Sequence, residues 1–144
     1  MTPILISVVD DDASVRKTTK LLIESFGYRA VVFESAETFL ESGQLNDTSC
    51  LVVDVQMQGM NGLQLQSHLA SEGCFIPIIF ISAYGNKESR RQAMQGGAIA
   101  FLDKPFGDEK LLKNIRSALK QAKDRRRQAN DRVSEMNTHQ QNRT

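Results

Sequence analysis

The sequence predicts an α/β fold, with a doubly wound, five-stranded parallel sheet and helices on both faces. Short runs rich in Val, Ile, Leu and Phe alternate with amphipathic stretches, which is the pattern of buried parallel strands joined by crossover helices. Glycine follows most of the amphipathic stretches, where a helix commonly ends on a left-handed residue. The 144 residues are 40% apolar, which suits one domain with a sizeable core.

Five apolar runs are expected to be strands. Each is four to six residues long, which is the length of a strand rather than of a helix, and each is dominated by residues that favour buried strands. In chain order the runs are Ile4–Val9, Arg29–Phe33, Cys50–Val53, Ile76–Ile81 and Ile99–Leu102.

Helices are expected between and after these strands, because apolar residues recur there at spacings of three and four. Gly27, Gly73 and the pair Gly96-Gly97 mark the ends of the first, third and fourth helices. The residues that define the first four helices are Val15, Thr19, Leu22, Ile23 and Phe26; then Ala36, Phe39 and Leu40; then Leu63, Leu65, Gln66 and Leu69; and finally Arg90, Ala93 and Met94.

The last helix is expected to start at Gly107-Asp108-Glu109, where acidic residues favour a helix N-terminus. Small or apolar residues continue at a 4-3 spacing to Met136. A helix of that length would exceed ~40 Å and project from a body about 35 Å across, as a signalling linker or short coiled coil. The alternative is a polar tail that frays after about Ala122. We expect residues 137–144 to be disordered in either case.

Charge divides the chain into a body, residues 1–121, and a basic helical linker, residues 122–144. The net charge is +1 overall, but six basic and three acidic side chains follow Ala122, which leaves the body slightly acidic. This balance does not indicate a nucleic-acid or membrane binder.

No apolar run is long enough to span a membrane, and the isolated Cys50 and Cys74 suit core positions in a reducing compartment. A cytoplasmic protein is therefore expected.

Polar side chains follow four of the five expected strands. They are Asp10, Asp11 and Asp12 after the first, Asp54 after the third, Ser82 after the fourth, and Lys104 after the fifth. In an open parallel sheet these strand ends form one rim, where ligands bind. Converging carboxylates repel each other unless a cation joins them, and an all-oxygen ligand set favours Mg²⁺, with Mn²⁺ as an alternative. The lysine and hydroxyl suit a phosphoryl group, so the rim indicates phosphoryl transfer to an Asp.

These motifs closely resemble the receiver domains of two-component response regulators, from about Ile4 to about Leu119. The resemblance implies the flavodoxin-like strand order 2-1-3-4-5. Three shorter stretches resemble the FixJ/NarL-like subgroup, namely Val15–Lys17, Ala36–Leu40 and Lys104–Phe106. The motifs that carry the main resemblance are Val8–Asp12, Val53–Asp54 with Met57, Met60 and Gly62, Ile81–Ala83, and Ala98–Phe106.

The resemblance implies that Asp54 accepts a phosphoryl group from a phosphohistidine of a sensor histidine kinase. Asp10, Asp11 and Asp54 would hold Mg²⁺ together with the backbone carbonyl of Gln56. Lys104 would pair with Asp54 at rest and with a phosphoryl oxygen afterwards, and its peptide bond to Pro105 is expected to be cis.

The resemblance also implies a switch. The hydroxyl of Ser82 would bond the phosphoryl group, and the ring of Phe101 would turn inward as that hydroxyl moves, which shifts the population between two packings. Gln56 and Tyr84 match positions that tune the loss of the phosphoryl group. The sequence departs from the usual pattern at Gln58, where many receivers have Pro, so the loop after Asp54 is expected to be less rigid.

Such a receiver is expected to be a signalling domain and not an enzyme. Its own activity would be limited to self-phosphorylation from small donors and slow autodephosphorylation. Its expected output is transcription, through a DNA-binding domain that the given sequence does not include. A homodimer through the fourth helix, fifth strand and last helix is a further expectation from the resemblance. One alternative is a stand-alone receiver that acts by protein contact or phosphorelay.

A haloacid-dehalogenase-type phosphotransferase is a remote alternative. The spacing Asp10-x-Asp12-x-Ser14 fits the nucleophile motif of that family. However, that family also needs a later acidic motif on a further strand, and Asp54 would have no role in it.

Overall fold

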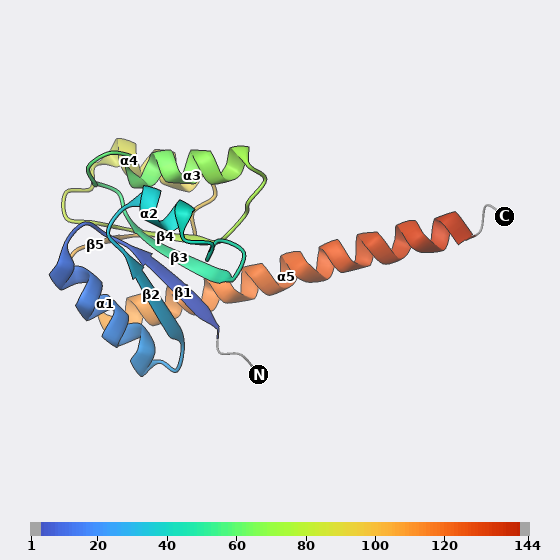
Figure 1. Ribbon diagram of the computed structural model, residues 1–144, viewed down its shortest axis with the longest axis horizontal. Helices are drawn as coiled ribbons and strands as arrows, with labels where there is room; N and C mark the ends of the chain where they lie inside the picture. The colour runs from blue at the N-terminus through green and yellow to red at the C-terminus, as the bar shows by residue number, and fades with distance from the viewer. Residues whose placement is uncertain (1–3, 142–144) are drawn as a thin grey trace.

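The computed structural model describes residues 4–141, with side chains described as far as Arg125. Five strands form one parallel sheet in the order β2-β1-β3-β4-β5, which confirms the expected fold and strand order (Figure 1). The strands are β1 (Leu5–Val9), β2 (Arg29–Phe33), β3 (Thr48–Asp54), β4 (Ile78–Ser82) and β5 (Ala100–Asp103).

The strands differ from the expected runs mainly at their ends. β3 begins earlier than the apolar pattern, because Thr48 is buried and hydrogen-bonds Ser7 of β1. β4 begins after Pro77, which lacks a backbone N–H and contributes only its carbonyl, to the N–H of Leu51.

Five helices alternate with the strands, and local sequence explains where they begin. Asp12 caps α1 by accepting from the N–H groups of Ser14 and Val15, and Asn61 forms a capping box with Gln64 at α3. Gly27, Gly73 and Gly97 all have positive φ angles just beyond helix ends, as the glycine pattern predicted. The helices are α1 (Ala13–Ser25), α2 (Ala36–Glu41), α3 (Gly62–Ser71), α4 (Lys87–Gln95) and α5 (Asp108–Gln141).

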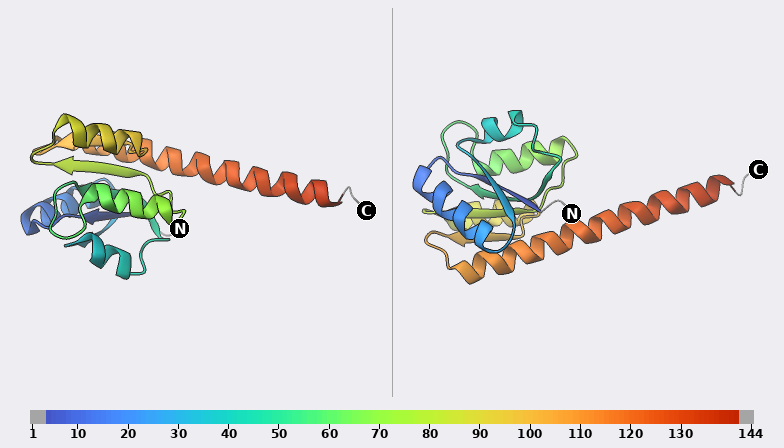
Figure 2. Two further views of the ribbon diagram at one scale, coloured as in Figure 1. Left: turned by 90° about the horizontal axis from the view of Figure 1, so that it is seen from above. Right: turned by 60° about the horizontal axis from the view of Figure 1, so that its bottom comes forward.

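The core consists of two apolar layers, one on each face of the sheet. One layer joins the sheet to α2, α3 and α4 through residues such as Phe39, Leu65 and Ala93. The other joins it to α1 and α5 through Ile23, Leu111 and Ile115. Figure 2 shows α5 on one side of the sheet and α2 and α3 on the other. Alternating side chains on each strand therefore face opposite layers.

α5 runs as one helix from Asp108 to Gln141 and projects well beyond the sheet (Figures 1 and 2). It starts near the carboxyl ends of the strands and leaves the body at the opposite end of the sheet, where β1 begins. Residues 137–141, which were expected to be disordered, belong to this helix, and residues 142–144 lie outside the described residues. Within residues 4–141, no helix combines the length and apolar content needed to cross a bilayer.

Candidate functional site

Three carboxylates meet at the rim formed by the carboxyl ends of β1 and β3. Asp10 and Asp11 follow β1, and Asp54 is the last residue of β3. These two strands are adjacent and parallel, so their ends lie side by side. One oxygen from each of the three carboxylates lies within 4.8 Å of the others. Asp10 and Asp54 are buried, whereas Asp11 is exposed.

Asp10 is held in place from several directions. Its Oδ1 accepts the backbone N–H of Asp12 at 2.8 Å, and its Oδ2 accepts from Nζ of Lys104 at 2.9 Å. The guanidinium of Arg16, one turn into α1, donates to the Asp10 backbone carbonyl at 2.8 Å. The side chain of Asp10 is fully buried, so the Asp12 N–H and the Lys104 ammonium replace the water that the carboxylate loses.

Lys104 follows the carboxyl end of β5, and its side chain reaches across the rim. Its Nζ donates to Oδ2 of Asp10 at 2.9 Å and to Oδ2 of Asp54 at 3.3 Å. Burial by itself would lower the pKa of Lys104, but the hydrogen bonds and negative charges of Asp10 and Asp54 outweigh it and raise the pKa. The lysine therefore stays charged and offsets part of the repulsion between the two buried carboxylates. The Lys104–Pro105 peptide bond is cis, as expected.

Asp54 has a raised pKa. Burial is the largest cause, and the negative charge of Asp10 adds to it. The backbone N–H of Gln56, which donates to Oδ1 of Asp54 at 3.1 Å, and the charge of Lys104 act in the opposite direction. The structure thus makes the charged form of Asp54 costly without a further cation.

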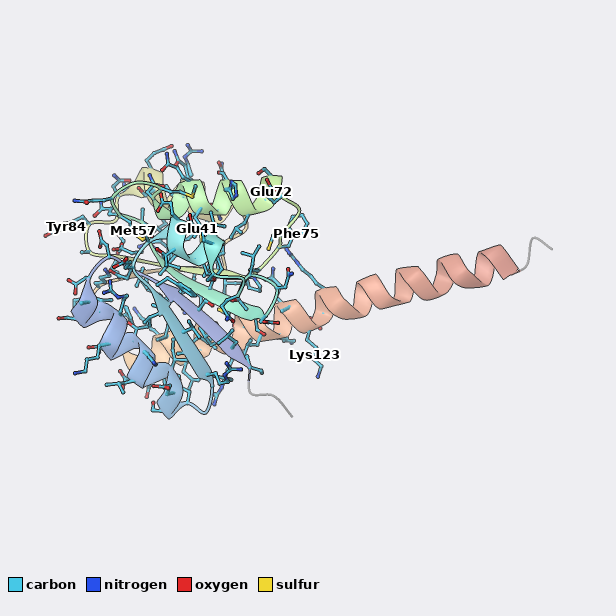
Figure 3. The ribbon with its side chains drawn as sticks, in the orientation of Figure 1. Glu41, Met57, Glu72, Phe75, Tyr84 and Lys123 are labelled. Carbon is cyan, nitrogen blue, oxygen red and sulfur yellow. The ribbon has the colours of Figure 1, made fainter. Side chains whose placement is uncertain are left out.

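Ser82 lies at the end of β4 beside Asp54, and it is fully buried. Its Oγ accepts the backbone N–H of Tyr84 at 3.2 Å, and the Tyr84 carbonyl accepts from Nε2 of Gln56 at 3.3 Å. Gln56 and Tyr84 were expected to tune the loss of the phosphoryl group. The side chain of Gln56 contacts the backbone of Tyr84 and not its ring. The Tyr84 side chain itself is 79% exposed and points outward (Figure 3).

Phe101 is buried against the sheet, and it is 6% exposed. Its ring lies 6.3 Å from that of Phe80, and the guanidinium of Arg90 on α4 lies 4.8 Å from its centroid. Arg90 also donates to the Phe101 carbonyl at 3.2 Å and pairs with Asp103 at 3.3 Å. Thus α4, β5 and the loop after β4 meet at this ring.

The chemistry of the donor set fits a small divalent cation. All three candidate ligands are carboxylate oxygens that converge within 4.8 Å, and no His or Cys belongs to this cluster. Magnesium prefers oxygen ligands and is commonly held by one or two carboxylates while it keeps several waters. The exposed Asp11 leaves the site open on one side to water or to a phosphoryl group.

Sequence reasoning located Asp10, Asp11, Asp54, Ser82 and Lys104 at one rim, and the structure brings them together. It missed several supporting contacts, because neither periodicity nor motif spacing marks a hydrogen bond between a helix residue and a separate strand or loop. The missed residues are Arg16, Glu37, whose carboxylate accepts the Met60 N–H at 2.8 Å, and Arg90 as a partner of Phe101.

Comparison with known proteins gives a consistent result. Residues 6–116 match the family model described as the response regulator receiver domain. The chain is 42% identical over 125 residues to nodulation protein W of Bradyrhizobium diazoefficiens, covering 87% of this chain and 55% of that protein. It is 44% identical over 112 residues to the transcriptional regulatory protein TdiR of Thauera aromatica, covering 78% and 49%. The chain thus spans about half the length of these curated relatives.

Solved structures agree in fold. The response regulator StyR superposes with a TM-score of 0.84 at 38% identity, covering 95% of this chain and 70% of that one. The structure titled FixJ-N superposes with a TM-score of 0.74 at 31% identity, covering 83% and 96%.

Proposed function

The chain belongs to the response regulator receiver domain family, and from that membership we propose that Asp54 accepts a phosphoryl group from a sensor histidine kinase. The observation that carries the assignment is the convergence of Asp10, Asp11 and Asp54 within 4.8 Å, with Lys104 bridging two of them. In the proposed reaction an Oδ atom of Asp54 attacks the phosphorus. The bond from phosphorus to the donor nitrogen breaks, and the donor imidazole leaves with its electron pair and takes up a proton.

We propose that Asp10, Asp11, Asp54 and the Gln56 carbonyl hold Mg²⁺, with Mn²⁺ as a substitute. The bound cation supplies charge neutralisation for the phosphoryl oxygens. Lys104 is already anchored on Asp10 by a 2.9 Å hydrogen bond, so its ammonium remains in the site when Asp54 reacts and can pair with a phosphoryl oxygen. Burial of Asp54 limits the approach of bulk water to the acyl phosphate.

The switch is proposed to run through Ser82 and Phe101. The Ser82 hydroxyl can donate to the phosphoryl group, and Tyr84 follows because its backbone N–H donates to the Ser82 Oγ. Because Gly85, Arg90 and Phe101 are packed together, a movement of this loop changes the packing of α4 on β5. Phosphorylation then shifts the population of two existing packings.

The same proposal includes the output that the phosphorylated receiver would control. We infer that residues 1–121 form the receiver and residues 122–144 a helical linker toward an output, which for the relative TdiR is described as transcriptional regulation. A homodimer through α4, β5 and α5 is the proposed active assembly, and the cytoplasm is the proposed location, where free thiols such as Cys50 and Cys74 stay reduced. DNA would be contacted only through an output domain.

Phosphopeptide mass spectrometry tests the assignment. The full chain is incubated with acetyl phosphate, with and without Mg²⁺, and Asp54→Asn serves as the control. We expect one added phosphoryl group, dependent on Mg²⁺ and located on Asp54. A label on Asp10 would instead support a haloacid-dehalogenase-type reaction, and equal labelling of Asp54→Asn would refute Asp54 as the acceptor.

A further inference from the structure

The loop between β3 and α3, residues 55–61, receives one side chain from a distant helix. Glu37 lies in the first turn of α2, and its Oε1 accepts the backbone N–H of Met60 at 2.8 Å. The two residues are 23 positions apart, so this contact exists only because α2 and the loop lie side by side in the fold. Nothing in the assigned site uses Glu37 directly.

The two ends of this loop are already fixed. At its start, the Gln56 N–H donates to Asp54, and the carbonyl of Val55 accepts from Gly62 at 3.0 Å. At its end, the capping box joins Asn61 and Gln64. Among the described residues, no hydrogen bond other than that from Met60 to Glu37 reaches the backbone of residues 57–60. One hydrogen bond, to Glu37, therefore holds the backbone in the middle of the loop, and the side chains of Met57 and Met60 pack against the core beside it.

The backbone passes very close to that carboxylate. Gly59 has a φ of +73°, and a Cβ atom there would lie 2.9 Å from Oε1 of Glu37. Residues with a side chain rarely adopt this backbone conformation, so a glycine at position 59 lets the chain turn closely around Glu37. The hydrogen bond from Met60 is also the largest cause of a lowered pKa of Glu37, which shows that the contact favours the charged carboxylate.

α2 has only six residues, but its N-terminal cap and its packing in the core hold it in place. Ser35 caps its N-terminus by accepting the Thr38 N–H. Phe39, two residues after Glu37, is fully buried, and its ring lies 5.3 Å from that of Phe33 in β2. The backbone that carries Glu37 is thus anchored in the core.

We propose that Glu37 is a positioning residue for the phosphoacceptor site, because it fixes the middle of the 55–61 loop between its two anchored ends. This role rests on the proposed function of Asp54. Glu37 touches neither the phosphoryl group nor the cation in this proposal. It acts through the backbone of Met60 and limits the conformations that the loop can adopt before Mg²⁺ and the donor bind.

A variant series separates this role from a general effect on α2. Glu37→Ala removes the acceptor, Glu37→Gln keeps an uncharged acceptor, and Glu41→Ala, an exposed residue on the same helix, is the matched control. We measure amide exchange of Met60 by NMR, Mg²⁺ affinity by titration, the rate of Asp54 labelling by acetyl phosphate, and unfolding by urea.

In Glu37→Ala we expect Met60 amide protection to fall roughly three- to tenfold, in line with the loss of one solvent-exposed hydrogen bond. Mg²⁺ affinity and the Asp54 labelling rate should each fall by a factor of about three to ten. Glu37→Gln should lie between the parent and Glu37→Ala, and Glu41→Ala should match the parent.

Two results would overturn the proposal. One is unchanged Met60 protection in Glu37→Ala. The other is lost protection with Mg²⁺ affinity and labelling that match Glu41→Ala, since the loop would then not need the contact. A fall in unfolding stability with unchanged site readouts would assign Glu37 to α2 alone. If the parent itself is not labelled on Asp54, the proposed function fails, while Met60 exchange and Mg²⁺ affinity still decide the role of Glu37.

Discussion

Nζ of Lys104 lies closer to Asp10, at 2.9 Å from its Oδ2, than to Asp54, at 3.3 Å. Asp10 is the more deeply buried of the two carboxylates and also accepts from the Asp12 backbone. The lysine thus has a fixed anchor that does not react and a second, longer contact to the carboxylate that does in the proposed reaction. Asp54 can exchange its share of Lys104 for another cation without releasing the lysine from the site.

Magnesium should stabilise the fold, because it relieves the repulsion among three converging carboxylates. At a free Mg²⁺ concentration 100 times Kd, the free energy of unfolding should rise by about 2.7 kcal/mol. Asp11→Ala should raise Kd by at least about tenfold and thus lose about 1.4 kcal/mol of this stabilisation. Urea unfolding in EDTA and in Mg²⁺ measures both effects. Glu24→Ala, an exposed carboxylate on α1, is the control and should behave as the parent; equal stabilisation of Asp11→Ala would contradict the site.

Gly85→Ala should disturb the ring of Phe101. A Cβ atom at Gly85 would lie 2.6 Å from Cε1 of that ring, so either the loop or the ring must move, at a cost of about 1–3 kcal/mol. The same substitution in a Phe101→Leu background should cost clearly less, because the smaller side chain leaves room. A urea-unfolding double-mutant cycle measures this coupling. Additive effects would show that the two residues do not constrain each other.

Arg125 and Phe75 should hold α5 where it leaves the body. The guanidinium of Arg125 lies 5.5 Å from the Phe75 ring and donates to the Phe75 carbonyl at 3.2 Å, and Figure 3 shows Phe75 beside the projecting helix. Phe75 is exposed, so we expect a coupling of about 0.5–1 kcal/mol in a double-mutant cycle. Amide exchange of the α5 residues near Arg125 should rise in Arg125→Ala. Lys123→Ala, on the same helix, should leave that exchange unchanged.

Tyr84 is expected to slow the loss of the phosphoryl group, so that the phosphorylated state lasts minutes or longer. Since its side chain is 79% exposed, a direct shield over Asp54 would require the ring to turn inward after phosphorylation. Phosphate release, timed from purified phosphorylated protein, should therefore be faster in Tyr84→Ala than in the parent. An unchanged rate would leave Tyr84 with only its backbone link to Ser82 and Gln56.

The fold class, the order of helices and strands, and the residues at the rim could be predicted from the amino-acid sequence. Parallel strands buried on both faces must be apolar, and their carboxyl ends must share one edge, so the positions of Asp10, Asp54, Ser82 and Lys104 follow from local pattern alone. The motif resemblance added the strand order, which periodicity cannot provide.

The contacts that support these residues became visible only in the folded structure. The sharing of Lys104 between Asp10 and Asp54, the packing of Arg90 on Phe101 and the hydrogen bond from Met60 to Glu37 all join residues of separate elements or loops. Sequence periodicity records which face a residue occupies, whereas such contacts depend on side-chain direction and on distances of a few ångströms between separate elements. Those distances are fixed only when the two core layers pack the helices onto the sheet.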